Sequence, residues 1–355
     1  MATGPPRPRQ PRPAPRTTTR DPAEVARRLS DWLDAQLPGA RAVDVSVPES
    51  NGMSSETLLF DIEHPEPPLR HCALRLAADP DAYTVFPVYD MARQHRTMRL
   101  VAERSDVPVP RVLWLERDPG PLGAPFFVME RVAGRVPPDV MPYAYEGNWL
   151  YEASDAERAH LEEATVGVIA HLHDQVPPAE AGFLALPGEG SALRRHVAFQ
   201  RAYYAWVVDG LPRSPLVESA FAKLGELWPR DEGAPVLNWG DARIGNVVYD
   251  GFEPAAVLDW EMACLAPPEV DIGWIVFLHR FFQDLTVRFG QPGLPDFLRR
   301  DMDFYTLYAA LRHAVIMLRV AYRQVHFGEV TVERDPDTLI LHHDRLAAMV
   351  QGDFG

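Results

Sequence analysis

The scarcest residue in this 355-residue sequence is lysine, which occurs once, at Lys223. Arginine therefore carries nearly all of the positive charge, and acidic residues still outnumber basic ones, for a formal net charge of −15. This balance argues against a general nucleic-acid binder, because a phosphate backbone attracts basic surfaces. The excess of acidic residues is most simply interpreted as a solvated acidic surface.

Cysteines and long apolar runs are also scarce. Cys72 and Cys264 cannot build a disulfide framework, and so few cysteines are typical of a reducing compartment. The best candidate for a membrane helix, at 309–318, is broken by Arg312 and His313 and is far shorter than the ~18 residues required. The N-terminal segment has no apolar core of the kind found in a signal peptide. We expect a soluble cytoplasmic protein without membrane contacts.

Several catalytic signatures are missing. The sequence has no G-x-S-x-G elbow, no G-x-x-x-x-G-K-[ST] phosphate loop and no H-E-x-x-H zinc motif. His171 and His173 are two residues apart on an expected helix, so they do not share a face. Without further ligands at metal-binding spacing, a structural or solvent-facing role is favoured over zinc binding.

The organisation along the chain changes twice. Residues 1–20 are rich in proline and arginine and cannot bury apolar surface, which predicts a disordered tail. Residues 21–133 begin with a helical stretch and continue as short alternating runs, whereas 134–355 are mostly helical. The sequence therefore predicts an α+β fold with two lobes, a small antiparallel β-sheet lobe followed by a larger, mainly helical lobe.

The expected elements follow from the period of the apolar residues. Strands are expected at 42–47, 56–62, 71–77, 111–117 and 124–132, with one helix inserted at 89–103. Helices are expected at 155–174, 193–209 and 298–325, and two short strands flank Gly251.

The chemistry is concentrated in residues 236–263, VLNWGDARIGNVVYDGFEPAAVLDWEMA. Asp241 is followed five residues later by Asn246 and, after a hairpin-like pair of strands, by Asp259. Phosphoryl transfer from ATP needs one carboxylate that orients and deprotonates the attacking hydroxyl, and oxygen ligands for Mg2+. Asp241 can supply the first function, and Asn246 and Asp259 the second. Taken singly, each residue is typical of a turn, and only the set with its spacing favours catalysis.

With these residues the sequence resembles the phosphotransferase superfamily of aminoglycoside and choline kinases, especially its actinobacterial-type members with a W-G-D-x-R-x-G-N motif. The resemblance covers about residues 40–280. It implies a protein-kinase-like fold and transfer of the γ-phosphoryl group of ATP, with Mg2+, to a hydroxyl of a small molecule. Asp241 matches the catalytic aspartate, Asn246 and Asp259 match the metal ligands, and Asp271 matches a structural aspartate.

The nucleotide phosphates are expected to meet the first lobe. Gly52, Ser54, Ser55 and Thr57 lie near the turn between the first two strands and are the closest matches to the family's phosphate loop. Small residues there let backbone N–H groups approach phosphate oxygens, although a plain hairpin turn is the alternative. Arg75 stands in the strand where the family usually has a lysine. It is the expected phosphate cation, with a solvated face as the alternative.

Adenine is expected at the strand that joins the lobes. By resemblance, backbone groups near Glu130 and Val132 would hydrogen-bond the base, and Phe127 and Met129 could form its walls. As single residues, these two side chains are more typical of a core.

Two further departures from the family pattern leave other functions open. Gln94 falls where the family helix carries a glutamate, and Trp239 falls where a histidine is common. With Arg75, they raise the alternative of a nucleotide-binding regulatory module without transfer activity. A weaker alternative is an interaction protein that uses residues 1–20.

The acceptor is not specified by the motif. Aminoglycosides follow from the resemblance, but other hydroxylated metabolites are collectively favoured, because a fold does not fix a substrate. Asp301, Asp303 and residues 305–308 could line the acceptor pocket, or they could belong to a packed amphipathic helix.

Overall fold

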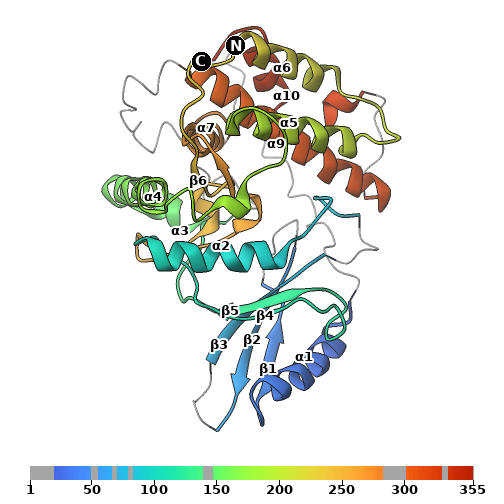
Figure 1. The fold of residues 1–355 in the computed structure, drawn as a ribbon, viewed down its shortest axis with the longest axis vertical. Helices are drawn as coiled ribbons and strands as arrows, with labels where there is room; N and C mark the ends of the chain where they lie inside the picture. The colour runs from blue at the N-terminus through green and yellow to red at the C-terminus, as the bar shows by residue number, and fades with distance from the viewer. Residues whose placement is uncertain are drawn as a thin grey trace.

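The computed structural model describes residues 20–48, 55–65, 70–78, 83–138, 147–282, 301–329 and 335–354. Two lobes stack along the long axis of the molecule, with a β-sheet in the lobe drawn in blue and cyan and helices in the other (Figure 1). The expected bilobal α+β fold is confirmed. In the parts of the chain so described, no helix combines the length and apolarity needed to traverse a membrane.

The first lobe is built on one antiparallel sheet. Its strands are β1 (Arg41–Ser46), β2 (Glu56–Glu63), β3 (Arg70–Leu76), β4 (Val112–Glu116) and β5 (Phe126–Glu130). They pair in the order β1-β2-β3-β5-β4. The alternating runs of the sequence therefore correspond to these five strands, with ends that differ by a few residues at most.

Two helices flank this sheet. Helix α1 (Pro22–Gln36) begins as expected, because the Asp21 carboxylate accepts a hydrogen bond from Ala23 N and proline occupies the first turn. Trp32 of α1 packs edge-on against Phe126 of the sheet. Helix α2 (Met91–Arg104) lies between the sheet and the second lobe (Figure 1), and it contacts β4, β5 and the turn at Trp260–Met262.

The segment that connects the two lobes packs against the second lobe. Arg135 exchanges two backbone hydrogen bonds with Tyr249, at 2.9 and 2.8 Å. Gly134 has φ +148°, and a Cβ there would lie 2.6 Å from the Tyr249 carbonyl oxygen. Only glycine lets the backbone approach so closely, which fixes the connection to the second lobe.

The second lobe is mainly helical, as expected. Its helices are α3 (Trp149–Glu152), α4 (Asp155–Gln175), α5 (Ala192–Val207), α6 (Pro215–Glu226), α7 (Glu269–Val276), α9 (Met302–His326) and α10 (His343–Val350). Helices α4, α5 and α9 correspond to the three expected ones, although 298–300 lie outside the described residues. Helix α9 packs against α5, α6, α7 and α10 and forms the centre of the lobe.

Two small sheets hold the loop that carries the motif. Strand β6 (Val236–Asn238) pairs with β9 (Cys264–Ala266), and β7 (Val247–Asp250) pairs with β8 (Glu253–Val257). The β7–β8 hairpin was expected, but the β6–β9 pair was not, because three residues are too few to show a strand period. The motif thus forms a loop, a hairpin and a turn, closed at its base by two paired strands.

Candidate active site

Asp241 lies in the loop between β6 and β7, and both of its carboxylate oxygens are held. Trp274 Nε1 donates to Oδ1 at 2.7 Å. Asn246 Nδ2 donates to Oδ2 at 2.7 Å, and Arg243 Nε donates to the same oxygen at 3.2 Å. The carboxylate therefore has one defined orientation, as a group that must align a reacting hydroxyl requires.

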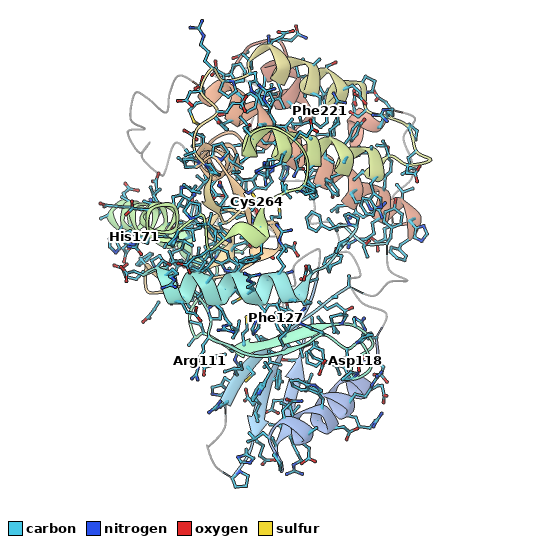
Figure 2. All side chains as sticks on the ribbon, viewed as in Figure 1. Arg111, Asp118, Phe127, His171, Phe221 and Cys264 are labelled. Atoms are coloured by element: carbon cyan, nitrogen blue, oxygen red, sulfur yellow. The ribbon has the colours of Figure 1, made fainter. Side chains whose placement is uncertain are left out.

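The same loop is fixed from beneath by Asp271, the first-turn residue of α7 that is fully buried. Its carboxylate accepts hydrogen bonds from Trp239 N at 2.7 Å and Gly240 N at 2.8 Å. His173 Nε2 donates to it at 3.0 Å, whereas His171 is exposed on α4 (Figure 2). Asp271 thus acts on the backbone of the loop, in keeping with the structural role expected for it.

Gly240 allows the loop to turn tightly before Asp241. Its φ is +91°, and a Cβ would lie 2.1 Å from the Met262 carbonyl oxygen. Its own carbonyl accepts a hydrogen bond from Arg312 Nη2 at 3.0 Å. Any side chain at this position would displace either the loop or the turn that follows Asp259.

Asn246 and Asp259 are brought together by the β7–β8 hairpin. Val247 pairs with Val257, and the Asn246 carbonyl accepts from Leu258 N at 2.8 Å, so Asp259 follows directly. Asp259 has φ +60°, a left-handed conformation that aspartate adopts more readily than most residues. The hairpin register therefore places the two expected metal ligands at the same end of the hairpin.

Arg75 reaches this site from the first lobe. Its Nη2 lies 2.9 Å from Asp259 Oδ1 and 3.7 Å from Glu261 Oε2, and its Nη1 donates to Thr57 Oγ1 at 3.3 Å. The side chain is 12% exposed, which is incompatible with a solvated face. The one cation expected at the phosphates is thus within contact of the expected metal ligand.

The two other departures from the family pattern are both buried. Gln94 is 4% exposed on α2, while its neighbour Arg93 donates to the Ala263 carbonyl at 2.7 Å. Trp239 is completely buried, and its Nε1 donates to the Leu258 carbonyl at 2.8 Å. Helix α2 and Trp239 therefore both support the segment around Asp259 through backbone carbonyls.

The expected phosphate loop is described only in part, since Gly52 and Ser54 lie outside the described residues. Ser55 is completely buried, and its Oγ has no hydrogen-bond partner within the described ranges. A buried hydroxyl without a partner is costly, and a phosphate oxygen could satisfy it. Thr57 thus offers a hydroxyl in contact with Arg75, and Ser55 offers a second hydroxyl two residues earlier in the chain.

The strand expected at adenine offers fewer groups than its sequence suggests. The N–H of Glu130 already donates to the Arg111 carbonyl at 2.9 Å, so that residue has only its carbonyl to offer a base. Phe127 is 1% exposed and Met129 8%, which makes them mainly core residues, and Val132 is half-buried.

The residues considered for the acceptor belong mostly to the core. Residues 305–308 of α9 are buried, and the Tyr308 hydroxyl is hydrogen bonded to His196 Nδ1 at 2.7 Å. The packed-helix alternative therefore describes them correctly. Asp303 lies in the first turn of α9 and is exposed.

The donors at Asn246 and Asp259 fit Mg2+ brought in with a nucleotide. Asn246 turns its amide nitrogen to Asp241, which leaves the amide oxygen as the end able to bind a cation. Within the described ranges, no group of three or more His, Cys, Asp or Glu side chains could hold a metal ion. Mg2+ commonly takes one or two protein carboxylates and completes its shell with phosphates and water, so this small donor set is sufficient.

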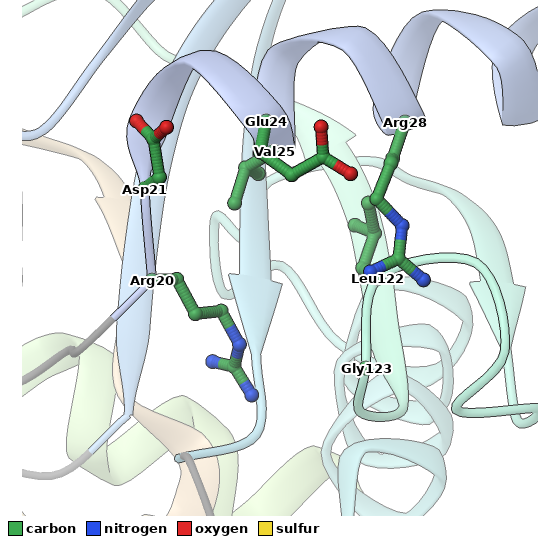
Figure 3. A pocket seen from close by; sticks show the side chains of 7 residues that line it. All are labelled: Arg20, Asp21, Glu24, Val25, Arg28, Leu122 and Gly123. Atoms are coloured by element: carbon green, nitrogen blue, oxygen red, sulfur yellow. The ribbon is translucent and has the colours of Figure 1, made fainter.

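A pocket lies beside the start of α1 in the first lobe (Figure 3). It is lined by Arg20, Asp21, Glu24, Val25, Arg28, Leu122 and Gly123. None of these residues belongs to the segment around Asp241 or Asp259. Arg20 also pairs with Glu56 at the start of β2.

The fold and the loop are those of a bilobal, kinase-like phosphotransferase. The model of the phosphotransferase enzyme family APH matches residues 84–312, more than half of the chain. The chain therefore belongs to this family, which confirms the resemblance and the expected class of enzyme.

Solved structures agree with this fold. A putative aminoglycoside phosphotransferase from Ralstonia eutropha is similar with a TM-score of 0.62 and 23% identity, over 92% of this chain and 97% of its own. A second similar structure is a thermostable mutant of aminoglycoside phosphotransferase APH(4)-Ia in ternary complex with ADP and hygromycin B. Its TM-score is 0.61 and its identity 17%, over 92% of this chain and 99% of its own. At such identities the likeness shows the fold alone.

Curated relatives bear different names. Probable acyl-CoA dehydrogenase IBR3 of Arabidopsis thaliana is 25% identical over 73% of this chain and 32% of its own length. Acyl-CoA dehydrogenase family member 10 of Mus musculus is 24% identical over 68% of this chain and 24% of its own length. The chain thus spans a third or less of these relatives.

Proposed function

We propose that this protein transfers the γ-phosphoryl group of ATP to a hydroxyl of a small molecule, with Asp241 as the base and Asn246 and Asp259 as the Mg2+ ligands. The observation that carries the proposal is the hydrogen-bonded pair of Asp241 and Asn246 beside Asp259, in a chain of the phosphotransferase family. Cys72 and Cys264 are free thiols, which suits the reducing cytoplasm as the place of action.

Asp241 is suited to orient a hydroxyl and to accept its proton. Trp274, Asn246 and Arg243 fix the direction of its carboxylate and stabilise its negative charge. Phosphoryl transfer passes through a loose transition state that depends mainly on positioning and charge, which a carboxylate held in one orientation supplies. Bound Mg2+ would neutralise charge on the phosphates.

The first lobe would hold the nucleotide through three side chains. Arg75 carries the positive charge, and Ser55 and Thr57 supply hydroxyls for phosphate oxygens. Adenine would meet the Glu130 carbonyl and the backbone at Val132. Neighbouring folds are known with ADP, AMP-PNP or GDP bound, which supports a purine nucleotide in this lobe.

The acceptor is more consistent with a neutral or anionic hydroxyl compound than with a polycation. Arg243 pairs with Oδ2 of Asp241 and therefore places positive charge beside the carboxylate oxygen that the acceptor hydroxyl would reach. That charge would repel an aminoglycoside and attract a phosphate or carboxylate substituent. Because the curated relatives are named as acyl-CoA dehydrogenases, hydroxylated acyl compounds belong in the first set of acceptors tested.

The test is release of ADP from MgATP across sugars, hydroxy acids, hydroxylated acyl compounds and aminoglycosides. Asp241→Asn should lower kcat at least a hundredfold on any accepted compound while ATP binding persists. Asp250→Asn changes an exposed aspartate at the end of β7 and should leave kcat unchanged. Full activity in Asp241→Asn would contradict the proposal.

The alternative of a regulatory nucleotide-binding module is favoured by one observation, the uncharged Gln94 at the position of the helical glutamate. It predicts that wild-type protein binds MgATP but transfers phosphate neither to an acceptor nor to water. Measuring binding and ADP release on the same preparation separates the two functions.

A further inference from the structure

Trp274 is the most distant of the residues that hold Asp241, because it lies 33 positions further along the chain, on α7. Its side chain is buried, with 2% of the residue exposed, and its indole N–H donates to Asp241 Oδ1 at 2.7 Å. Asn246 and Arg243 act on the other oxygen. Without Trp274, no described donor would fix Oδ1.

Arg312 fixes the indole ring in turn. Its guanidinium carbon lies 4.5 Å from the Trp274 ring centroid, and its Nη2 donates to the Gly240 carbonyl at 3.0 Å. The residue is 1% exposed, and its Nε and Nη1 have no hydrogen-bond partner within the described parts of the chain. Burying a cation with so few partners is costly, so contact with the ring and the loop is its main compensation.

From this arrangement we propose that Trp274 is a positioning residue for phosphoryl transfer, and that Arg312 holds its ring in place. The inference rests on the proposed function of Asp241. With Oδ2 occupied by Asn246 and Arg243, Oδ1 is the oxygen better placed to meet the acceptor hydroxyl. The indole N–H donates to one lone pair of Oδ1 and leaves the other lone pair for the acceptor hydroxyl. The carboxylate is therefore already oriented before the acceptor binds.

The chain contains a matched pair with no such role. Trp32 Nε1 donates to Glu116 Oε2 at 3.0 Å in the first lobe, again from a buried indole to a carboxylate. Phenylalanine at either position removes the same donor from the same kind of bond. A comparison of the two variants therefore separates positioning of Asp241 from the general loss of a tryptophan.

The kinetic test compares Trp274→Phe with Trp32→Phe. Trp274→Phe should lower kcat about tenfold to a hundredfold while KM for ATP changes less than about threefold, since the nucleotide ligands are untouched. Trp32→Phe should keep kcat within about twofold. Arg312→Lys should lower kcat in the same direction as Trp274→Phe. Equal kcat values for wild type and Trp274→Phe would overturn the inference.

A spectroscopic test needs no turnover. In 15N-labelled protein, Asp241→Asn should shift the indole N–H resonance of Trp274, because a charged acceptor becomes neutral, and should leave that of Trp32 in place. An unshifted Trp274 resonance would contradict the contact and with it the inference. If wild type transfers no phosphate, the proposed function fails and Trp274 has nothing to position. If wild type is active and Trp274→Phe keeps its kcat, the inference alone fails.

Discussion

Arg75 of β3 and Asp259 of the second lobe form an ion pair, with 2.9 Å between Nη2 and Oδ1. The pair joins the residue expected at the ATP phosphates to the residue expected at Mg2+. Both side chains are mostly buried, so the two charges are weakly screened. On the proposed function, Asp259 would hold Mg2+ and Arg75 would contact the phosphates of the nucleotide.

Replacing Arg75 should therefore weaken nucleotide binding. We expect Arg75→Met to raise the Kd for MgATP about tenfold to a hundredfold, because a charge-assisted contact with phosphate is lost. Arg75→Lys keeps the charge without the planar fork and should lie between Arg75→Met and wild type. Calorimetry measures each Kd, and Arg41→Met, which removes an exposed pair with Glu63, serves as the control. An unchanged Kd in Arg75→Met would place the phosphates elsewhere.

Gly240 is predicted to be the least replaceable glycine of the loop. Gly240→Ala would force a Cβ against the Met262 carbonyl oxygen, 2.1 Å away, at a φ of +91°. We expect a loss of about 3 kcal/mol or more in the free energy of unfolding, or failure to fold.

The matched control for this prediction is Gly167→Ala. Gly167 lies inside α4 with no atom within 4 Å of the added Cβ, so alanine there should stabilise the protein by about 0.5–1 kcal/mol. Thermal unfolding of both variants measures the difference. Equal stability of Gly240→Ala and wild type would show that the loop does not need this turn.

Stability should fall in mild acid because of a buried histidine. Burial lowers the pKa of His342 to about 4, below the ordinary value of 6.5. Between these values the unfolded chain binds a proton that the folded chain does not, so the free energy of unfolding falls as the pH drops from 6.5 to 4. A shift of this size corresponds to about 3 kcal/mol.

His342→Gln removes this contribution, together with the effect of His342 on the neighbouring His313. Burial raises the pKa of Glu162 to about 7, which acts in the opposite direction over a similar pH range, so the wild-type curve alone is ambiguous. The difference between wild type and variant removes that contribution. We expect the variant's free energy of unfolding, from urea titrations at pH 4.5 and 7, to depend less on pH. Parallel curves for both proteins would contradict the prediction.

Local patterns were sufficient for much of the fold. Alternation along 56–62 and 71–77 identified β2 and β3, and the spacing of Asp241, Asn246 and Asp259 identified the loop and hairpin that bring them together. These features depend on neighbours in the sequence. The register of a hairpin is set by its turn, and a helix cap such as Asp21 is next to its helix in the sequence.

The contacts that position the site depend on tertiary packing and left no local signal. Trp274 lies three residues after Asp271, and Arg312 interrupts an apolar stretch of α9, but neither position indicates a contact with the loop of Asp241. The partner of Arg75 is 184 residues away. His173, for which the spacing predicted only a structural or solvent-facing role, supports Asp271 across the fold.

The central claim is that Asp259 binds Mg2+ together with ATP, and calorimetric titration of ATP with and without Mg2+ tests it most directly. Wild type should bind ATP more tightly with Mg2+ than without it. Asp259→Ala should weaken binding of ATP in the presence of Mg2+ at least tenfold. Asp344→Ala, which changes an exposed residue of α10, should leave this binding unchanged. No ATP binding to wild type, or equal Mg2+-dependent binding in Asp259→Ala, would contradict the account.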